Sequence, residues 1–510
     1  MGMSRHDEVE RTYDVDRTTT LPTLTDTEGV SAMGQPTEVE LVAVYFDTVD
    51  LDLARQGTTL RRRTGGLDEG WHLKLPAGKD TRTEVRLPLG RAVKTVPARL
   101  REQVRAVVRD RPLVPVVRIS TRRMEYKLVG DDNAVLAEVC DDQVHAERLN
   151  GREQVQDWRE WEVELVDGAR PMLDAVEQHL LTAGASPASS TSKLARALGG
   201  AIPETPDRPS RKSLRRGSAA QLVLAHLAEQ TAQLHRHDAG LRANRPDSIH
   251  KMRIAARRLR SALTTYRPLL VPNSAETVGA ELRWLGQVLG DARDAQVLRE
   301  HLDLLVASEP PAMVLGPVVK RIDDELRTAY QTGREQALEA LDSERYFRLL
   351  DTLDDLVRLK PLTNEADAPA KQVLPHLLRR DAKRLRRAVR DVARTEDRQQ
   401  RDLKLHEARK KAKRLRYAAE SAAPVLGGRV KALATSTQKV QEALGQHQDA
   451  AVARQKLREY GVQAHASGEN GFTFGRLHAL EQSRADEAER RFGTAWKRLQ
   501  RKKFRRWIKK

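Results

Sequence analysis

Two kinds of hydrophobic patterning divide the chain. Between residues 6 and 166, apolar and polar positions alternate over eight short stretches separated by turn residues, a period typical of β-strands. Beyond about residue 218, the apolar positions recur every three or four residues, which predicts long helices. The patterning therefore predicts an α+β region, built mostly of strands, followed by an all-α region.

The predicted strands run from EVERTYDV at 8–15 to REWEVELV at 159–166. Short amphipathic helices with Pro or Gly at their ends are expected at 97–110 and 171–184. In the C-terminal region, the 3.6-residue period predicts a series of longer helices. These span 218–240, 247–267, 276–306, 312–341, 373–394, 402–422 and 429–459.

A segment without periodicity separates the two regions. Residues 197–218 are rich in Pro, Gly and Ser, a composition typical of linkers. A chain of 510 residues is also too long for a single hydrophobic core. We therefore predict one domain over 1–200, a linker over 201–217 and a second domain over 218–510.

A basic phrase is written twice in the C-terminal region. His250 begins HKMRIAARRLRSAL, and His406 begins HEARKKAKRLRYAAE 156 residues later. The sequence LGDARDA after the first phrase likewise returns as LGQHQDA after the second. This repeat predicts two copies of one helical module, at about 218–360 and 373–510. With about four helices in each copy, we expect two four-helix bundles related by a pseudo-twofold axis.

The repeated phrase places its basic residues on one side of a helix. Positions 0, 3, 7 and 10 of each copy fall within an arc of about 80°. Basic residues opposite an apolar face are commonly plain solvated surface, but repetition at one register favours a polyanion site. Arginine binds phosphate oxygens in a bidentate manner, and lysine supplies a compact charge. The candidate residues are His250, Arg253, Arg257, Arg258, Arg260, His406, Arg409, Lys413, Arg414 and Arg416.

Net charge supports an anionic partner for the C-terminal region. The formal charge of +18 divides into −5 for residues 1–200 and +23 for residues 201–510. Such a potential attracts nucleic acids, phosphate polymers or acidic lipid surfaces without choosing among them. Aromatic residues make up only 4% of the chain, and no nucleic-acid-binding motif is present, which disfavours a specific nucleic-acid partner. The alternative of a non-catalytic scaffold that binds polyanions or nucleic acid stays open.

The two phrases, each followed by an LGxxxDA helix, resemble the CHAD domain, the conserved-histidine α-helical domain. The resemblance covers about residues 211–510. It implies two four-helix bundles around a basic central channel, and binding of inorganic polyphosphate through the ten residues named above. It also suggests an association with polyphosphate granules.

Charged residues of the N-terminal strands also keep to single faces. Glu8 and Glu10 alternate on the first strand, as Glu162 and Glu164 do on the last, so each pair projects to one side. Basic residues on the strands between them are spaced in the same way. A closed barrel would bring carboxylates that bind Mg²⁺ or Mn²⁺ next to cations that bind phosphate. A half-solvated sheet with a charged outer face is the alternative.

The series EVERT, YFDT, LRRR, WHLKLP, TEVRLPL, LAEVCDDQV, WEVEL and SKLARAL resembles the CYTH family of triphosphate tunnel enzymes. The resemblance spans about residues 6–200. It implies an eight-stranded antiparallel β tunnel barrel that binds a triphosphate-containing small molecule with Mg²⁺ or Mn²⁺, as a triphosphatase or an adenylyl cyclase. We favour hydrolysis, because a domain that resembles a polyphosphate binder follows in the same chain.

The resemblance assigns roles to individual residues. The acids that match its metal-binding and catalytic positions are Glu8, Glu10, Glu162 and Glu164, with Glu138 as a further metal ligand. The basic residues that match its phosphate-binding positions are Arg61, Arg63, Lys74, Arg86, Arg118, Arg122 and Lys193.

One position departs from the family pattern. The family begins with Glu-x-Glu-x-Lys, and Thr12 stands where the lysine belongs. Arg11 cannot replace it, because neighbouring residues of a strand point to opposite faces. Loss of one transition-state donor costs about 2.7–4 kcal/mol. We therefore predict that the tunnel binds its ligand, and we leave its catalytic activity open.

Three features bear on location. Cys140 is the only cysteine, so no disulfide forms within the chain, and a reducing compartment is expected. No apolar run of about 18 residues is present. The first residues lack the pattern of a secretory leader. We expect a cytoplasmic protein without a membrane partner.

Overall fold

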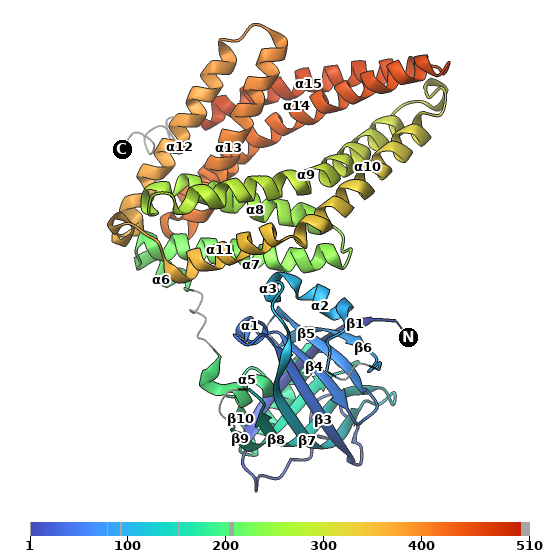
Figure 1. The fold of residues 1–510 in the computed structure, drawn as a ribbon, viewed down its shortest axis with the longest axis vertical. Helices are drawn as coiled ribbons and strands as arrows, with labels where there is room; N and C mark the ends of the chain where they lie inside the picture. The colour runs from blue at the N-terminus through green and yellow to red at the C-terminus, as the bar shows by residue number, and fades with distance from the viewer. Residues whose placement is uncertain (1, 79, 92–93, 151–153, 203–208, 501–510) are drawn as a thin grey trace. The chain divides into compact units, whose positions relative to one another are not determined.

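The computed structural model describes residues 2–78, 80–91, 94–150, 154–202 and 209–500. The chain divides into two compact units, Met1–Pro206 and Asp207–Lys510 (Figure 1). Two stretches covered by the sequence predictions lie outside the described residues. They are 203–208, within the predicted linker, and 501–510, at the end of the predicted second repeat.

The N-terminal unit is built on a closed antiparallel barrel, as the strand pattern predicts. Its strands are β1 (Ser4–Val15), β2 (Ala32–Met33), β3 (Thr37–Asp47), β4 (Thr59–Thr64), β5 (Gly70–Gly78), β6 (Thr81–Leu87), β7 (Val114–Val129), β8 (Val135–Arg148), β9 (Val155–Leu165) and β10 (Ser186–Pro187). The eight long strands are hydrogen-bonded in the order β1-β6-β5-β4-β3-β7-β8-β9, and β9 pairs back with β1. The two short strands β2 and β10 pair with β7 and β1.

Short helices accompany the barrel. They are α1 (Asp52–Arg55), α2 (Ala98–Gln103), α3 (Arg105–Val108), α4 (Arg170–Thr182) and α5 (Lys193–Leu198). The helix predicted at 97–110 is divided at Val104 into α2 and α3. The helix predicted at 171–184 is present as α4.

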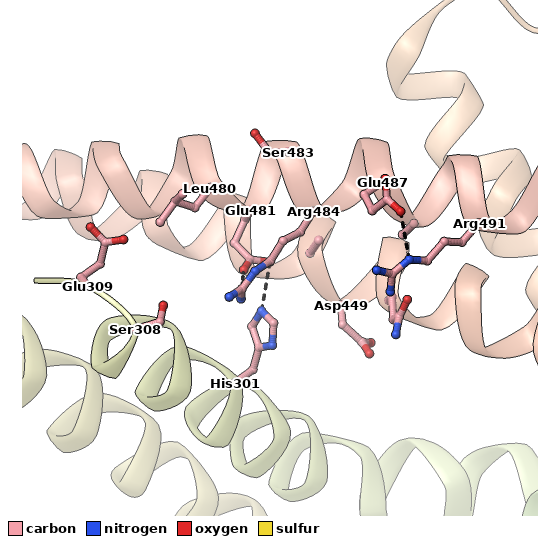
Figure 2. Close-up of a pocket in the computed structure, with 13 residues that line it drawn as sticks. His301, Ser308, Glu309, Asp449, Leu480, Glu481, Ser483, Arg484, Glu487 and Arg491 are labelled. Carbon is pink, nitrogen blue, oxygen red and sulfur yellow. Dashed lines mark hydrogen bonds and ion pairs between the residues drawn. The ribbon is translucent and has the colours of Figure 1, made fainter.

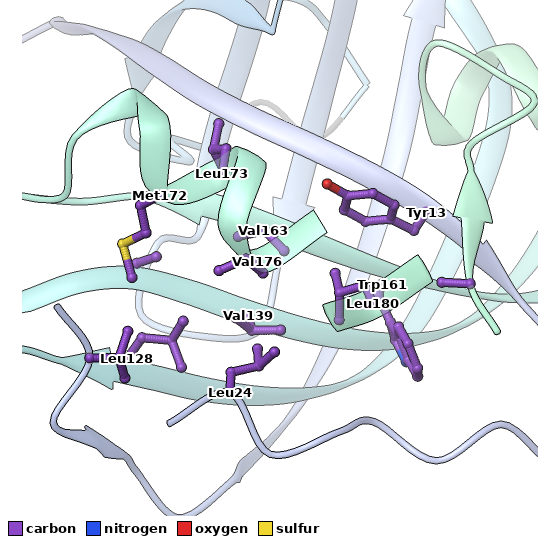
Figure 3. Close-up of a cluster of buried hydrophobic side chains, with 13 residues drawn as sticks. Tyr13, Leu24, Leu128, Val139, Trp161, Val163, Met172, Leu173, Val176 and Leu180 are labelled. Atoms are coloured by element: carbon purple, nitrogen blue, oxygen red, sulfur yellow. The ribbon is translucent and has the colours of Figure 1, made fainter. Parts of the chain in front are cut away.

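The outer face of the barrel is its apolar face. Tyr13 on β1 and Trp161 on β9 are almost fully buried beneath Leu173 and Val176 of α4 (Figure 3). A second outer cluster packs Trp71 on β5 against α2 and α3. Because side chains alternate along a strand, the residues next to these in sequence point into the barrel. The charged residues at those neighbouring positions therefore face inward.

One end of the interior is closed by α5. Leu194 and Leu198 of this helix pack against the inward-facing residues Ile119 on β7 and Val144 on β8. The Ser192 side chain caps the helix by accepting a hydrogen bond from the backbone N–H of Ala195. This packing carries Lys193, the first residue of α5, into the charged part of the interior.

The second unit is helical. Its α-helices are α6 (Arg211–Arg216), α7 (Ala219–Arg242), α8 (Ser248–Thr265), α9 (Ser274–Ala307), α10 (Val318–Leu341), α11 (Glu344–Leu359), α12 (Ala370–Ala393), α13 (Arg398–Leu426), α14 (Gly428–Ala466) and α15 (Phe472–Leu499). Every predicted helix is present, and several run further than predicted. The short α6 occupies part of the segment interpreted as a linker. None of the described helices is long and apolar enough to span a membrane.

The helical unit contains the same order of helices twice. The series α7-α8-α9-α10 corresponds to α12-α13-α14-α15, and in each series the last two helices run side by side as a long antiparallel pair (Figure 1). The halves meet where α8 packs on α13 and α7 on α12. Buried hydrogen bonds from Thr265 to Asp381 and between Tyr266 and Ser421 join them. The two repeated four-helix sets predicted from the sequence are thus confirmed.

Candidate functional site

Acidic residues gather on the inner face of the barrel. The register of three neighbouring strands sets Glu10 of β1 opposite Glu164 of β9, which lies opposite Glu138 of β8. Glu8 and Glu162 occupy inward-facing positions of β1 and β9, two residues from Glu10 and Glu164. Closure of the barrel joins its first and last strands and so brings these five residues together. They are called the inner-face acids below.

Basic residues reach these acids from β5 and β6. Lys74 Nζ lies 2.7 Å from Glu8 Oε2 and 3.1 Å from Glu10 Oε2. Arg86 Nη2 lies 3.1 Å from Glu8 Oε1. In this state the acids and cations of the interior therefore neutralise one another, and a phosphate or a metal ion would replace some of these pairs.

Strand β4 adds two inward-facing arginines. Arg61 Nη1 donates a hydrogen bond to the Tyr45 hydroxyl over 3.3 Å, and Arg63 forms an ion pair with Asp68. Burial, followed by repulsion from Arg61, lowers the pKa of Arg63 to about 9. An anion bound between the two guanidinium groups would relieve this repulsion.

A second cluster surrounds Glu162 near α5. Arg123 Nη2 lies 2.7 Å from Glu162 Oε2 and 2.7 Å from Asp142 Oδ2. Lys193 Nζ lies 3.3 Å and 3.0 Å from the same two oxygens, and 2.7 Å from Glu160 Oε1. Burial alone would raise the pKa of Glu162, but Lys193 and Arg123 hold it well below its usual range. Glu162 is therefore ionised at neutral pH.

Two residues predicted to line the tunnel, Arg118 and Arg122, do not face it. Arg118 is 50% exposed and pairs with Glu147, and Arg122 is 58% exposed and pairs with Glu38. Both occupy even-numbered positions of β7, whose odd-numbered Arg123 points inward. The prediction was wrong because two consecutive arginines do not by themselves reveal which of them faces the interior.

The sequence analysis missed several residues of the inner face, among them Arg123, Asp142 and Glu84. Asp142 and Glu84 are fully buried, although both are charged residue types. The alternation that selected Arg86 on β6 also selects Glu84, two positions earlier. Alternation from Leu128 of β7 and Val139 of β8, which belong to the outer apolar cluster, places Arg123 and Asp142 on the inner face. The inward-facing apolar residues Ile119 and Val144 obscure this signal in the sequence.

Thr12 lies opposite Glu162 across the β1–β9 pair. The position where the family has lysine therefore adjoins an acid that Arg123 already neutralises. Arg11 points outward, as predicted, and its Nη1 pairs with Glu177 of α4 at 2.5 Å. The interior lacks a cation at position 12, but Glu162 is not left unpaired.

The donor set of the inner face fits a divalent metal ion. Carboxylate oxygens are the ligands that Mg²⁺ and Mn²⁺ prefer. Burial, together with neighbouring carboxylates of which Glu8 is the foremost, raises the pKa of Glu164 to about 8. Glu164 therefore holds a proton at pH 7, which a bound cation would displace.

The two histidine phrases lie on α8 and α13, and the first arginine of each is placed by the LGxxxDA sequence of the same half. Arg253 Nη1 pairs with Asp294 at 2.8 Å, and Arg409 Nη2 lies 3.9 Å from Asp449. The glycine of the second copy, Gly445, leaves room for its arginine, because a Cβ there would lie 3.3 Å from Arg409 Nη2. This contact explains why the two sequences are repeated together.

Four of the ten candidate residues are cations that have no acidic partner within ion-pair distance among the described residues. They are Arg257 and Arg260 on α8, and Lys413 and Arg414 on α13, and they are called the unpaired cations below. Burial, followed by repulsion from Arg257 and Arg409, lowers the pKa of Lys413 to about 7. Uncompensated charge of this kind costs folding free energy, which a bound anion would recover.

Two further arginines of the phrases serve to hold the halves together. Arg258 of α8 and Arg416 of α13 pair with Glu420 at 3.0 and 2.8 Å. Both guanidinium groups also lie over the ring of Tyr417, at 5.4 and 5.2 Å from its centre. The sequence predicted that both arginines bind polyphosphate and did not predict their shared partner Glu420, which joins α8 to α13.

The two histidines have different neighbours. His406 Nδ1 lies 2.8 Å from Gln448 Oε1. The corresponding position of the first half is Arg293, whose charge, after burial, lowers the pKa of His250. Burial also lowers the pKa of His406. Both rings are therefore neutral at pH 7, and a nearby phosphate would favour their protonation.

A cavity of about 640 Å³ lies between α9 and the α14–α15 pair (Figure 2). There, His301 Nε2 of α9 lies 3.0 Å from Glu481 Oε2 of α15. Asp449, which also approaches Arg409, forms part of its wall. Because carboxylates outnumber guanidinium groups on its walls, this cavity suits a polyanion less well than the unpaired cations do.

Comparison with known proteins assigns both units to families. Residues 6–198 match the model of the CYTH domain, and residues 225–458 match that of the CHAD domain. An uncharacterised protein of Mycobacterium tuberculosis, MT2285 in one strain and Rv2226 in another, is 40% identical over 512 residues. The alignment covers 97% of this chain and 97% of the relative.

Two solved structures resemble parts of the chain at low identity. PptA from Streptomyces chartreusis is 21% identical, with 55% of this chain and 99% of that chain covered and a TM-score of 0.47. The CHAD domain from the plant Ricinus communis is 24% identical, with 55% and 92% covered and a TM-score of 0.42. The two family matches agree with the two observed units. The chain belongs to the CYTH-CHAD proteins, in which an N-terminal CYTH domain is joined to a C-terminal CHAD domain.

Proposed function

We propose that the chain binds inorganic polyphosphate through its CHAD domain, and that its CYTH tunnel binds a triphosphate and hydrolyses it with a divalent metal ion. The observation that carries the proposal is the set of unpaired cations where the two CHAD halves meet. Charges without partners are costly in a folded protein unless a ligand neutralises them.

The cations of the CHAD domain form a series that suits a linear polyanion. Arg260 of α8 has Arg283 of α9 and Arg414 of α13 as electrostatic neighbours. Arg414 in turn lies near Asp381 of α12 and near Arg384, which pairs with that acid. Cationic groups from four helices thus follow one another, interrupted by Asp381. A phosphate chain, with a negative charge on each unit, can neutralise such a series more completely than a single compact anion.

In the tunnel, cations and acids have separate tasks. Arg61, Lys74 and Arg123 are placed to donate to the nonbridging oxygens of a triphosphate and to neutralise charge at its terminal phosphorus. The inner-face acids would hold the metal ion, which supplies further neutralisation and orients a water molecule. Attack of a water molecule on the terminal phosphorus would break the bond to the bridging oxygen. With tripolyphosphate, the products are orthophosphate and diphosphate.

Phosphate release from tripolyphosphate tests the tunnel half of the proposal. The full chain is assayed with Mg²⁺ and with Mn²⁺, beside Glu162→Gln and the control Glu147→Gln, whose side chain lies on the outer face. We expect Glu162→Gln to lower the rate by about 100-fold or more, as the loss of one group that stabilises the transition state typically does. The control should match the unchanged protein. No release by the unchanged protein with either metal would contradict hydrolysis.

Competition tests the CHAD half. Labelled polyphosphate bound to the full chain is displaced either by unlabelled polyphosphate or by duplex DNA at equal phosphate concentration. We expect DNA to compete at least about tenfold less well, a preference of roughly 1.4 kcal/mol. Equal competition would favour a general polyanion scaffold, since non-specific attraction depends mainly on charge.

A further inference from the structure

An imidazole joins the inner-face acids at the start of β1. His6 stands two positions before Glu8, so both side chains point inward, and it lies directly opposite Glu84 of β6. Its Nε2 is 3.1 Å from Glu8 Oε1 and 3.5 Å from Glu84 Oε2. The two glutamates are 2% and 0% exposed, whereas His6 is 41% exposed. The trio therefore has a buried acidic floor and a solvent-accessible imidazole.

The separations within this trio are those of ligands that share one metal ion. Its three ligand atoms all lie within 4.8 Å of one another. With metal–ligand bonds of about 2.1 Å, two ligand atoms would lie about 3.0 Å apart at a right angle and about 3.4 Å apart at a tetrahedral angle. The two distances from His6 Nε2, 3.1 and 3.5 Å, lie within about 0.1 Å of this range without rearrangement of the strands.

The protein satisfies the two buried acids of the trio to different degrees. Glu84 pairs with His72 and Arg86, whereas Glu8 is incompletely satisfied. Arg86 contacts both Glu8 and Glu84, and Lys74 Nζ lies 2.7 Å from Glu8 Oε2. Among the described residues, however, Glu8 Oε2 accepts no hydrogen bond of good geometry. Burial, partly opposed by the charge of Lys74, raises the pKa of Glu8. Because Arg86 is 34% exposed, it can turn toward a phosphate and leave the two carboxylates to a metal ion.

We propose that His6, Glu8 and Glu84 form a metal site that takes a first-row transition-metal ion such as Mn²⁺ in preference to Mg²⁺. Imidazole nitrogen is a good ligand for transition metals, whereas Mg²⁺ binds almost entirely through oxygen. The role of this ion rests on the proposed function of the tunnel, because the ion would lie beside Lys74 and Arg86. The His6 site itself can be tested without any turnover.

Electron paramagnetic resonance of Mn²⁺ bound to the full chain tests the site. We expect the spectrum of the unchanged protein to show coupling to an imidazole nitrogen, and His6→Gln to lose it. The same substitution should weaken Mn²⁺ binding at least about tenfold. Loss of a residue that only supports a metal ligand already weakens binding by about tenfold or more, and loss of a ligand should do no less. The control is His145→Gln, because His145 lies on the outer face of the barrel, where it pairs with Asp157. Its spectrum and affinity should be unchanged.

A second variant separates loss of the nitrogen ligand from loss of the fold. His6→Asp offers an oxygen ligand on the same strand position, so it should remove the nitrogen coupling while it retains divalent-ion binding and shifts the preference toward Mg²⁺. Bound Mn²⁺ without nitrogen coupling in the unchanged protein, or coupling that persists in His6→Gln, would overturn the inference. Neither result depends on phosphate release, so a failed hydrolysis assay and a failed metal site are distinguishable.

Discussion

At the scale of single residues, Lys413 makes the proposed polyphosphate site sensitive to pH. Its neighbours are Arg253 and Arg257 from α8, Arg409 from its own helix, and Asp449 from α14. The carboxylate is too distant for an ion pair, so the arginines prevail and, after burial, help lower the pKa of Lys413 to about 7. The first copy of the phrase has Arg257 at the corresponding position, and an arginine there does not titrate near neutrality.

Binding of polyphosphate should therefore take up a proton at Lys413. The protonated lysine attracts phosphate, and the free protein loses this charge as the pH rises through 7. We expect affinity to fall by about tenfold between pH 6 and pH 8 because of this residue. Isothermal titration in buffers of different ionisation enthalpy measures the uptake. In Lys413→Arg, the proton uptake near pH 7 should disappear, and its persistence would contradict this account of Lys413.

Thr12 leads to a second prediction at this scale. Because Arg123 and Lys193 already neutralise Glu162, a lysine at position 12 would add a third cation beside one acid. We expect Thr12→Lys to change phosphate release from tripolyphosphate by less than about tenfold, well below the effect of one missing transition-state donor. A gain of several hundredfold would show that the natural tunnel lacks an essential cation.

At the scale of elements, the sequence predicted which strands and helices form better than it predicted which way they face. The Glu-x-Glu pairs of β1 and β9 face inward, as their spacing predicted, although single acids, Asp7 and Asp157, lie on the opposite faces of the same strands. On β7 the consecutive arginines 122 and 123 left the direction ambiguous, and burial of the apolar side chains decided it. Arg258 was likewise predicted to bind phosphate. Its contact with Glu420 joins residues 162 positions apart, so nothing in the neighbouring sequence indicated it.

The close packing of α9 on α10 gives a prediction for an element. A Cβ at Gly333 of α10 would lie 2.6 Å from the backbone nitrogen of Ala292 on α9, so Gly333→Ala must push the helices apart. We expect a loss of about 1–3 kcal/mol in the free energy of unfolding. Urea unfolding followed by the loss of helical circular dichroism measures it.

The control for this prediction is Gly286→Ala on α9. A Cβ at Gly286 would meet no atom within 4 Å, so alanine should raise stability by about 0.5–1 kcal/mol through its higher helix propensity. If both substitutions stabilised the protein, the close approach at Gly333 would not be a constraint on the packing of the two helices.

At the scale of the whole molecule, two domains of different architecture present cations for phosphate in different ways. The CYTH domain, within a region of net charge −5, encloses its arginines and lysines among acids inside a barrel. The CHAD domain, within a region of net charge +23, leaves several of its cations unpaired where two repeated halves meet. Regional charge therefore pointed to the second site and concealed the first, which was indicated instead by the spacing of charged residues along the strands.

The central claim is that the unpaired cations, and not positive charge in general, bind polyphosphate. Isothermal titration of the full chain with polyphosphate at physiological salt tests it most directly, using two variants that each lose four charges. The first replaces the unpaired cations and consists of Arg257→Gln, Arg260→Gln, Lys413→Gln and Arg414→Gln. The second replaces exposed arginines that form surface ion pairs and consists of Arg348→Gln, Arg358→Gln, Arg398→Gln and Arg490→Gln.

At pH 6, where Lys413 is protonated, the two variants have equal net charge, so long-range attraction is matched between them. Exposed ion pairs contribute little to stability. We expect the first variant to bind polyphosphate at least about 100-fold more weakly than the natural chain, a loss of roughly 2.7 kcal/mol in binding free energy. The Kd of the second variant should stay within about threefold of that of the natural chain. Equal weakening of the two variants would contradict the central claim.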